Sequence, residues 1–392
     1  MSILRQFARV TVMNLKSVVQ RPATAAVIVV GIMGVVLVLI SMLALGTSLS
    51  ESLRSTGRAD RAIVLRGGSE TEIGSALFVD EVQMIFSAPG IASTTSGEPI
   101  ATADMVTAVQ LRKQGSDIRA SVVVRGMTDH GVMVRPEIQL VEGRWFTPGL
   151  DELIVGRSAQ SQFEALHIGD KVRLRRGEWT VVGMFESGNA LQGSLLADTK
   201  TLMAAYVRTR FNSVTVRLKS AAAFESFKAS LNSNPALTVE PIREVDYYSR
   251  LSTDISAATY VVSFVIGGIM GLGALFGALN TMYTTVSHRA VEIATLRAVG
   301  FGGGCVIAAI LAEAMILAVV GGLIGAAMAW LLLSGDTFAL GATEGSIVAQ
   351  LRVTPALVTI GLVWACVVGL LGGLFPAVRA ARMPVAVALK SE

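Results

Sequence analysis

Few residues of this 392-residue chain have the types and the spacing that catalysis requires. The phosphate-binding pattern G-x-x-x-x-G-K-[ST] and the nucleophile pattern G-x-S-x-G do not occur in it. The histidines His130, His167 and His288 are far apart, and none has the spacing of a metal ligand. Cys305 and Cys366 both lie in apolar runs, so neither a disulfide framework nor a cysteine metal site is indicated. We therefore predict a non-catalytic chain that itself binds no cofactor and no metal.

Glu313 offers chemistry of another kind, because it is the only charged residue between Gly302 and Gly335. A lone carboxylate within a lipid bilayer is costly, and its default interpretation is functional. The alternative is a carboxylate at the membrane edge that a neighbouring helix caps. The sequence leaves both interpretations of Glu313 open.

The segment from His288 to Gly300 has a helical pattern, and its two sides differ. At about 100° per residue, one side carries small residues and the other mixes charges with large aliphatic side chains. We expect the small side, Ala290, Ala294, Ala298 and Val291, to pack against the protein. The mixed side is typical of a protein interface and consists of Arg289, Glu292, Ile293, Leu296 and Arg297. We expect Ile293 and Leu296 to be its apolar anchors, with Glu292 and Arg297 fixing the register. An ordinary amphipathic loop helix is the alternative.

The chain is 52% hydrophobic and only 16% charged. It contains four uncharged or nearly uncharged runs, which must position Glu313 and the segment from His288 to Gly300. The first run exceeds the ~7–15 apolar residues of a signal peptide, which favours an uncleaved anchor over a cleaved signal. At about 1.5 Å per residue each run is long enough to cross a bilayer, and the second is long enough to project from it. The predicted transmembrane segments are 23–46, 255–287, 303–335 and 353–378.

The distribution of charge predicts the orientation of these segments. Residues 47–254 are nearly balanced, with 23 Lys and Arg against 24 Asp and Glu, although the whole chain has a net charge of +4. The excess positive charge lies in the N-terminus 1–22, the loop 288–302 and the tail 379–392, at Arg5, Arg9, Lys16, Arg21, Arg289, Arg297, Arg379, Arg382 and Lys390. The positive-inside rule therefore predicts that both termini and this loop are cytoplasmic. It also explains the basic balance without nucleic acid as a partner.

Residues 47–254 have the composition of a soluble domain. Short β-branched runs such as 106–111 and 180–185 predict strands, and the patterns at 80–87, 199–208 and 222–232 predict helices. We therefore expect a membrane α-helical protein of four helices, arranged one plus three, with a large extracytoplasmic α/β domain between the first two. The segment 336–352 is expected to be a short extracytoplasmic loop.

Small residues spaced by four recur in the last three predicted membrane helices. Such pairs let helices approach closely, although glycine is also generally common in membrane helices. The candidate packing residues are Gly267, Gly271, Gly273, Gly277, Gly321, Gly325, Gly369 and Gly373.

Several segments resemble one superfamily of ABC transporter permeases, the MacB/FtsX-like (type VII, mechanotransmission) superfamily, which also includes the lipoprotein-release permeases. In the membrane part they are Asn280–Phe301, Leu311–Ala314 followed by Gly321–Gly325, and Phe375–Leu389; in the large domain they are Glu142–Phe146, Glu152–Gly156 and Ile168–Gly183. The similarity is to MacB-like members without a fused ATPase domain. It implies an FtsX-like permease domain at about 255–385 and a MacB-like periplasmic domain at 47–254.

The resemblance also implies partners and a function. We expect a homodimer, or a heterodimer with a similar permease, docked through residues 289–297 on separate ATPase subunits that hold ATP and Mg. A periplasmic adaptor and an outer-membrane channel are further expected partners, and the setting is the lipid of the bacterial inner membrane. The expected role is export or extraction of a lipid, lipoprotein, peptide or hydrophobic drug. A relay that regulates an extracytoplasmic hydrolase or sensor without transport is the alternative.

Overall fold

The computed structural model describes residues 22–333, 337–342 and 345–384. The chain divides into two compact units: a helical unit (Met1–Gly46, Ala257–Asp336 and Leu351–Glu392) and an α/β unit (Thr47–Ser256 and Thr337–Gln350). The basic residues before 22 and after 384, on which the predicted orientation partly depends, lie outside the described residues.

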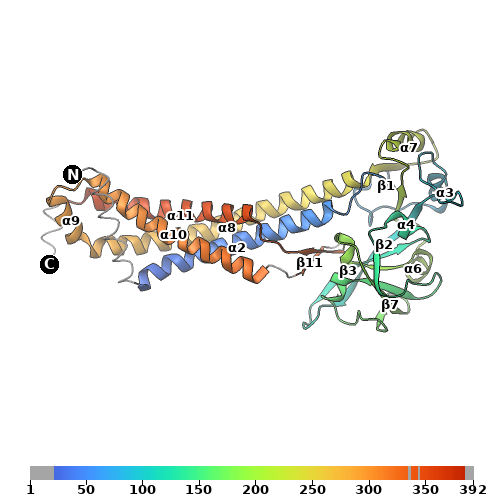
Figure 1. The fold of residues 1–392 in the computed structure, drawn as a ribbon, viewed down its shortest axis with the longest axis horizontal. Coiled ribbons are helices and arrows are strands. Elements are labelled where there is room, and N and C mark those ends of the chain that lie inside the picture. Colours follow the sequence, from blue (N-terminus) through green and yellow to red (C-terminus); the bar gives the residue numbers. More distant parts are fainter. Residues whose placement is uncertain (1–21, 334–336, 343–344, 385–392) are drawn as a thin grey trace. The chain divides into compact units, whose positions relative to one another are not determined.

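Four long helices form most of the helical unit: α2 (Pro22–Arg54), α8 (Glu244–His288), α10 (Gly303–Leu333) and α11 (Pro355–Arg382) (Figure 1). All four are long and apolar enough to cross a membrane, which confirms the predicted set of four. Helices α2 and α8 are longer than the uncharged runs, because their charged ends continue as helix within the α/β unit.

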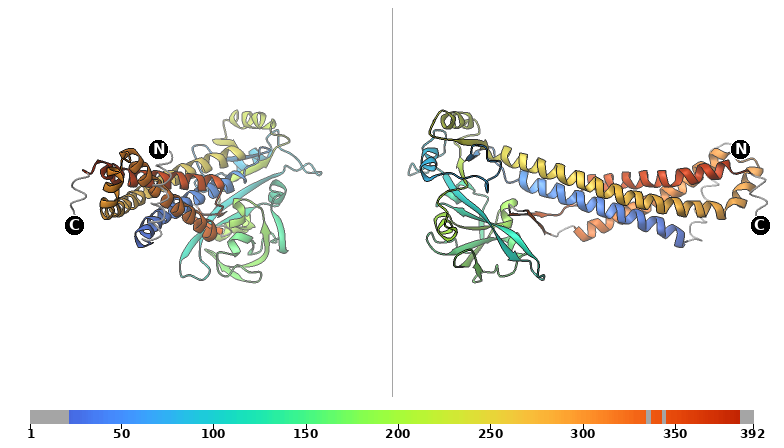
Figure 2. Two further views of the ribbon diagram at one scale, coloured as in Figure 1. Left: turned by 60° about the vertical axis from the view of Figure 1, so that its left-hand side comes forward. Right: turned by 180° about the vertical axis from the view of Figure 1, so that it is seen from behind.

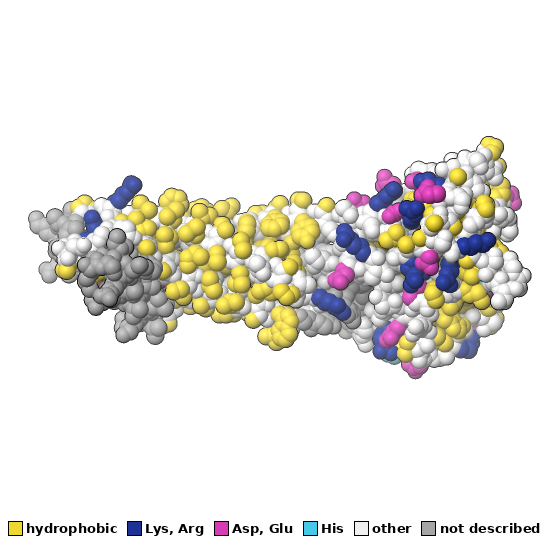
Figure 3. All heavy atoms as spheres, turned by 45° about the horizontal axis from the view of Figure 1, so that its top comes forward, with side chains coloured by type: hydrophobic (Ala, Val, Ile, Leu, Met, Phe, Trp, Pro, Cys, Tyr) yellow, Lys and Arg dark blue, Asp and Glu magenta, His cyan; other side chains and the backbone are white. Residues whose placement is uncertain are grey.

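The outer faces of these helices are apolar, as a lipid environment requires. On α8 the large side chains Val261, Val265, Ile269, Leu272 and Phe276 recur every three or four residues and are 55–67% exposed. Figure 3 shows that hydrophobic side chains cover this part of the surface, whereas the charged side chains gather over the α/β unit. Among the described residues this stripe is left exposed, as the apolar outer side of a membrane helix would be.

Glycines bring three of the helices close to their neighbours. A Cβ at Gly321 or Gly325 of α10 would lie 2.8 or 2.6 Å from a backbone oxygen of α2, so no larger residue fits there. Gly369 and Gly373 of α11 lie equally close to alanines of α10. Gly267 and Gly271 of α8 face side chains of α2 and α11 at 3.0 and 3.3 Å. By contrast, nothing described lies within 4 Å of a Cβ at Gly273 or Gly277, so packing within the chain does not explain those two residues.

The α/β unit is built on one ten-stranded mixed sheet (Figure 2). Its strand order is β10-β1-β9-β2-β3-β8-β5-β7-β4, and β6 pairs with β7 beside this path. Only the pairs β3–β8 and β5–β7 are parallel. The strands are β1 (Arg61–Arg66), β2 (Ala101–Arg112), β3 (Arg119–Met127), β4 (Gln139–Gly143), β5 (Glu152–Gly156), β6 (Lys171–Arg173), β7 (Glu178–Glu186), β8 (Leu195–Asp198), β9 (Ser213–Arg217) and β10 (Val239–Arg243).

Helices cover the sheet at separate places and define two main cores. Helix α6 (Thr199–Tyr206) packs over the core around Trp179, and helices α3 (Val79–Phe86) and α7 (Ala223–Asn232) pack over the core around Phe227. These three helices match the predicted ones to within two residues. The remaining helices are short: α4 (Gly131–Val134), α5 (Arg157–Gln160) and the 3₁₀ helix η1 (Ala190–Gly193).

The expected loop 336–352 is instead mostly a β-hairpin. Strands β11 (Thr337–Ala342) and β12 (Gly345–Gln350) pair antiparallel in continuous register and belong to the α/β unit. The segment contains few charges, and its short apolar runs are compatible with either a loop or a hairpin.

The close approach of α10 to α2 predicts how two matched glycine substitutions differ. Gly325→Val places a Cβ 2.6 Å from the carbonyl oxygen of Met33, so the helices must separate, at a cost of roughly 1–3 kcal/mol. Gly273→Val, at an exposed position with nothing within 4 Å, controls for the change in residue type. We expect thermal unfolding in detergent to shift downward for the first variant only. Equal shifts in both variants would contradict the assigned packing of α10 on α2.

Candidate functional site

The candidate site is the short helix α9 (Ala290–Ala298), which lies between α8 and α10 in the chain (Figure 1). It begins at Arg289, whose backbone departs from helical geometry and so separates α9 from α8. It is terminated just before Gly300, whose φ of 100° suits glycine. The amides of Gly300 and Phe301 donate hydrogen bonds to the carbonyls of Arg297 and Leu296. Both ends of α9 are therefore fixed by local geometry.

Three contacts hold α9 against the helical unit. The Arg289 guanidinium, 8% exposed, lies 3.5 Å from the buried carboxylate of Glu313 on α10 and donates to Glu292 at 2.9 Å. Ile293 is 8% exposed and belongs to the core of the helix bundle. Arg297 donates a 2.6 Å hydrogen bond to the carbonyl of Met383, directly after α11. The helix is thus tied to α10, to the core and to the end of α11.

This packing corrects the expected division of α9 into two sides. Ile293 and Arg289, placed by the sequence on the partner-facing side, are buried, while Leu296 and Arg297 are half-buried. Ala298 and Val291, expected to be packed, are exposed. The physical reason is that burying Arg289 beside Glu313 sets the rotation of the helix, and Ile293 then faces the core. The rotation of α9 cannot be predicted from the sizes of its side chains alone.

The exposed side of α9 is a single stripe. At about 100° per residue, its exposed residues fall within roughly a third of a turn. Val299 is 74% exposed and Val291 is 49% exposed. The stripe, which we call the α9 face, consists of Val291, Glu292, Thr295, Ala298 and Val299. It combines two exposed valines with one carboxylate, on a helix that is held in place from behind.

Glu313 has a partner in the folded chain. It is 6% exposed, and its carboxylate faces Arg289 from α10. An ion pair of this kind compensates two buried charges but becomes costly when only one partner is removed. The pair Arg289–Glu313 therefore joins α9 to α10, and both interpretations of Glu313 stay predictions.

A second cluster of charged residues, which the sequence did not predict, lies inside the α/β unit. Its charges alternate in sign along one chain of contacts: Glu72, Arg125, Asp104, Arg135, Glu244, Arg61 and Glu137. Arg125 donates two hydrogen bonds to the carboxylate of Glu72, at 2.9 and 2.6 Å, and one to Asp104 at 2.8 Å. Arg135 lies between Asp104 and Glu244, at 3.3 and 3.9 Å. We call these seven residues the ion chain.

The ion chain joins elements that are distant in sequence. Asp104 and Arg125 come from β2 and β3, Arg61 from β1, and Glu244 is the first residue of α8. Arg61 lies 2.5 Å from Glu244, and both side chains are fully buried. Helix α8 is therefore connected to the sheet by charge at its first residue.

The electrostatics of Glu72 follow from this setting. Burial raises the pKa of its carboxyl group, but the charge and hydrogen bonds of Arg125 and the hydroxyl of Ser213 lower it by more. The resulting pKa is about 2, below the ordinary 4.5. A signal for this cluster was present in the sequence, because Asp104 and Arg125 interrupt otherwise apolar strand patterns, and charged residues are seldom buried unless paired.

The described residues contain no group of three His, Cys, Asp or Glu side chains that could hold a metal ion. What the described residues do show at α9 and in the ion chain is apolar packing and charge pairing.

The pair Arg289–Glu313 predicts a non-additive pattern of stability. Glu313→Leu removes one carboxylate partner of the buried Arg289, which keeps its ion pair with Glu292, and should destabilise the protein by about 1–3 kcal/mol. Adding Arg289→Met removes the partly compensated charge and should recover part of the loss. The measurement is the unfolding midpoint of both single variants and the double variant in detergent. Additive losses would show that the two side chains do not act as a pair.

The low pKa of Glu72 predicts acid sensitivity of the α/β unit. Because the folded carboxyl has a pKa of about 2 against an ordinary 4.5, its stabilisation is complete above about pH 4.5 and is lost as the pH falls towards 2. The loss is on the order of 3 kcal/mol. Denaturant unfolding between pH 6 and 3, followed through Trp145 and Trp179 with the other tryptophans replaced, measures it.

The variant Glu72→Gln is less stable at pH 6 but should lose less stability on acidification than the parent protein. Glu152, whose pKa the hydrogen bond from Arg144 lowers to about 2, remains in both proteins and accounts for the residual acid sensitivity. Identical pH dependence in the two proteins would exclude Glu72 as an acid-sensitive group.

Comparison with known families places these features in context. Residues 23–234 match the family model of the MacB-like periplasmic core domain, and residues 264–385 match that of the FtsX-like permease C-terminal region. The second match contains α9, Glu313 and the end of α11.

Curated relatives agree with these matches. The chain is 31% identical over 144 residues to the macrolide export ATP-binding/permease protein MacB of Chromobacterium violaceum, covering 37% of this chain and 20% of that protein. It is 22% identical to the ABC transporter permease YknZ of Bacillus subtilis, covering 73% and 74%. The pyoverdine export protein PvdT of Pseudomonas savastanoi is 25% identical, covering 64% and 40%.

Two solved structures are similar to part of the chain. The periplasmic region of MacB from Actinobacillus actinomycetemcomitans is 15% identical over 53% of this chain and 98% of that one, with a TM-score of 0.37. The extracellular domain of YknZ is 13% identical over 46% and 99%, with a TM-score of 0.36. Because one family model alone covers more than half of the chain, the chain belongs to the ABC transporter permeases that have a MacB-like periplasmic core domain and an FtsX-like permease region.

Proposed function

We propose that this permease couples ATP hydrolysis by a separate ATPase subunit to movement of its α/β unit. In this proposal the α9 face receives the ATPase, α8 carries the movement, and the α/β unit acts outside the membrane. The cargo would be a lipid, lipoprotein, peptide or hydrophobic drug. The protein works as a homodimer or with a similar permease, and an adaptor and an outer channel complete the route.

The observation that carries the proposal is the continuity of α8. This helix runs without interruption for 45 residues, about 68 Å at the usual rise, from Glu244 in the ion chain to His288 beside α9. Arg289 then ties the next helix to α10. In this proposal a displacement of α9 therefore acts on the end of α8 at His288. The other end of α8, at Glu244, is joined to the sheet by ion pairs.

The α9 face has the properties that an ATPase contact requires. Its exposed valines supply apolar anchors and Glu292 supplies a charge, which matches the apolar core and polar rim of a protein interface. Because α9 is tied to α10 and α11 from behind, a push on the face reaches several helices. The anchors in this proposal are Val291 and Val299 in place of Ile293.

The orientation is part of the proposal. The positive charge of Arg289, Arg297 and Arg379, together with the basic termini, favours α9 on the cytoplasmic side, where an ATPase would find it. The nearly balanced residues 47–254 are then extracytoplasmic. The inner membrane of a bacterium is the corresponding location.

The relay alternative uses the same α8 and differs in its output. In that case the α/β unit would regulate an extracytoplasmic hydrolase or sensor, and no cargo would move. A neighbouring gene for an ATPase with a periplasmic adaptor supports export, whereas one for a wall hydrolase or a sensor kinase supports the relay.

The decisive experiment changes the α9 face without disturbing the core. The double variant Val291→Asp/Val299→Asp places two charges at exposed positions, so insertion and thermal stability should be unchanged. Binding of the ATPase that co-purifies with the parent permease should fall at least tenfold, because the apolar anchors are lost. Co-purification and permease-stimulated ATPase turnover measure the effect.

Two controls accompany this variant. Val141→Asp changes a 46% exposed valine of the α/β unit and should leave ATPase binding intact. A cysteine at Thr295, in a protein without Cys305 and Cys366, should react with an impermeant maleimide only in inside-out vesicles. Normal ATPase binding by the double variant, or labelling of Thr295→Cys from outside, would refute the proposed coupling surface.

A further inference from the structure

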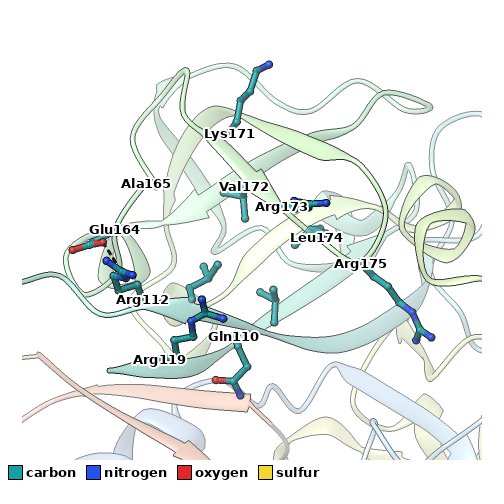
Figure 4. Close-up of a pocket in the computed structure, with 12 residues that line it drawn as sticks. Gln110, Arg112, Arg119, Glu164, Ala165, Lys171, Val172, Arg173, Leu174 and Arg175 are labelled. Carbon is teal, nitrogen blue, oxygen red and sulfur yellow. Dashed lines mark ion pairs between the residues drawn. The ribbon is translucent and has the colours of Figure 1, made fainter. Parts of the chain in front are cut away.

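A pocket of about 590 Å³ opens in the α/β unit, between the end of the β2–β3 hairpin and strand β6 (Figure 4). No part of the coupling proposal uses it. Its volume is within the range of pockets that hold small organic ligands. Its lining divides into an apolar part and a basic part, and each restricts what the pocket can hold.

The apolar part is the open edge of a core. Val172 and Leu174 are each 3% exposed and belong to the core around Trp179. Val109 and Leu111 of β2 pack against the same core but are only partly buried. These four aliphatic side chains line the pocket together, so a ligand there would complete the burial of Val109 and Leu111.

The basic part places two arginines directly opposite each other. In the antiparallel register of β2 and β3, Arg112 faces Arg119. Like charges in directly opposed positions destabilise a sheet. Figure 4 shows both guanidinium groups at one end of the pocket. An oxyanion that accepts hydrogen bonds from both guanidinium groups would replace this repulsion with two charge-assisted interactions.

The carboxylates of the chain compensate these charges incompletely. Asp117 and Glu164 approach only Arg112, at 3.4 and 3.9 Å, and both acids are well exposed. Among the described residues, no carboxylate lies within 4.0 Å of Arg119 or Arg173. The pocket therefore retains a net positive charge beside an apolar surface.

We propose that this pocket binds a small anionic amphiphile. The ligand has one phosphate, sulfate or carboxylate group between Arg112 and Arg119, and a short acyl or aromatic body against Val109, Leu111, Val172 and Leu174. A purely polar anion would leave the aliphatic surface wet, and a neutral apolar ligand would leave the arginines uncompensated. Binding at this pocket does not depend on the proposed coupling to an ATPase.

The test uses the full chain in nanodiscs of phosphatidylcholine, with n-octyl phosphate as the probe. Isothermal titration calorimetry should show saturable binding that empty nanodiscs lack and that weakens with added salt. The double variant Arg112→Gln/Arg119→Gln should bind at least tenfold more weakly, because the paired cations are lost. Lys200→Gln/Lys219→Gln removes two exposed cations outside the pocket, with the same change in net charge, and should bind like the parent.

A second variant tests the apolar part. Leu111→Ser, at a half-buried position that also packs against the core around Trp179, should weaken octyl phosphate binding several-fold and lower the unfolding midpoint only modestly, so that the protein stays folded at the assay temperature. Inorganic phosphate and n-octanol are the matched halves of the probe, and each should bind at least tenfold more weakly than the whole.

Four results would overturn the proposal: unchanged affinity in Arg112→Gln/Arg119→Gln, equal affinity for inorganic phosphate, equal affinity for octanol, or tighter binding of an acidic peptide that the same double variant abolishes. The last result would assign the pocket to a protein partner.

Discussion

The buried ion chain is the constraint on which the rest of the α/β unit depends. Three arginines and four carboxylates without this alternating order could not be taken out of water together, because each isolated charge costs several kcal/mol. Their geometry requires β1, β2, β3, the segment around Glu72 and the first residue of α8 to meet at one place. Glu244 joins the first turn of α8 to this cluster through its contacts with Arg61 and Arg135.

The helical unit also contains buried charges that compensate each other. Arg289 and Glu313 form one buried ion pair, and that pair determines which side of α9 faces the bundle. Close approach supplies the remaining order: Gly321 and Gly325 bring α10 against α2, with distances that exclude a Cβ. The contacts of Arg289, Ile293 and Arg297 hold α9 from one side, whereas Val291 and Val299 on its other side are 49% and 74% exposed. This contrast is why the α9 face, and no other part of the helical unit, is proposed to bind the ATPase.

The basic pocket adds a third use of charge, in which compensation is incomplete. In the ion chain every guanidinium reaches a carboxylate, but Arg119 faces another arginine and an aliphatic surface. The pocket and the ion chain belong to the same sheet and share β2 and β3. The proposed ligand would bind at one end of these two strands, and the ion chain lies towards the other end.

The four apolar helices and the α/β domain between the first two could be predicted from the sequence. Uncharged runs identified the four helices because burying charge in lipid is costly at any position, and strand and helix periods identified an α/β domain between the first two. The tertiary structure alone decided three other features. It showed that Arg125 pairs with both Glu72 and Asp104, that 337–350 contains a hairpin, and that Ile293 points inward. The ion pairs and the burial of Ile293 depend on residues far apart in the chain, whereas the hairpin is a local pairing that its short apolar runs did not distinguish from a loop. A periodic pattern shows which side chains share a face, but only the opposing element shows whether that face is buried.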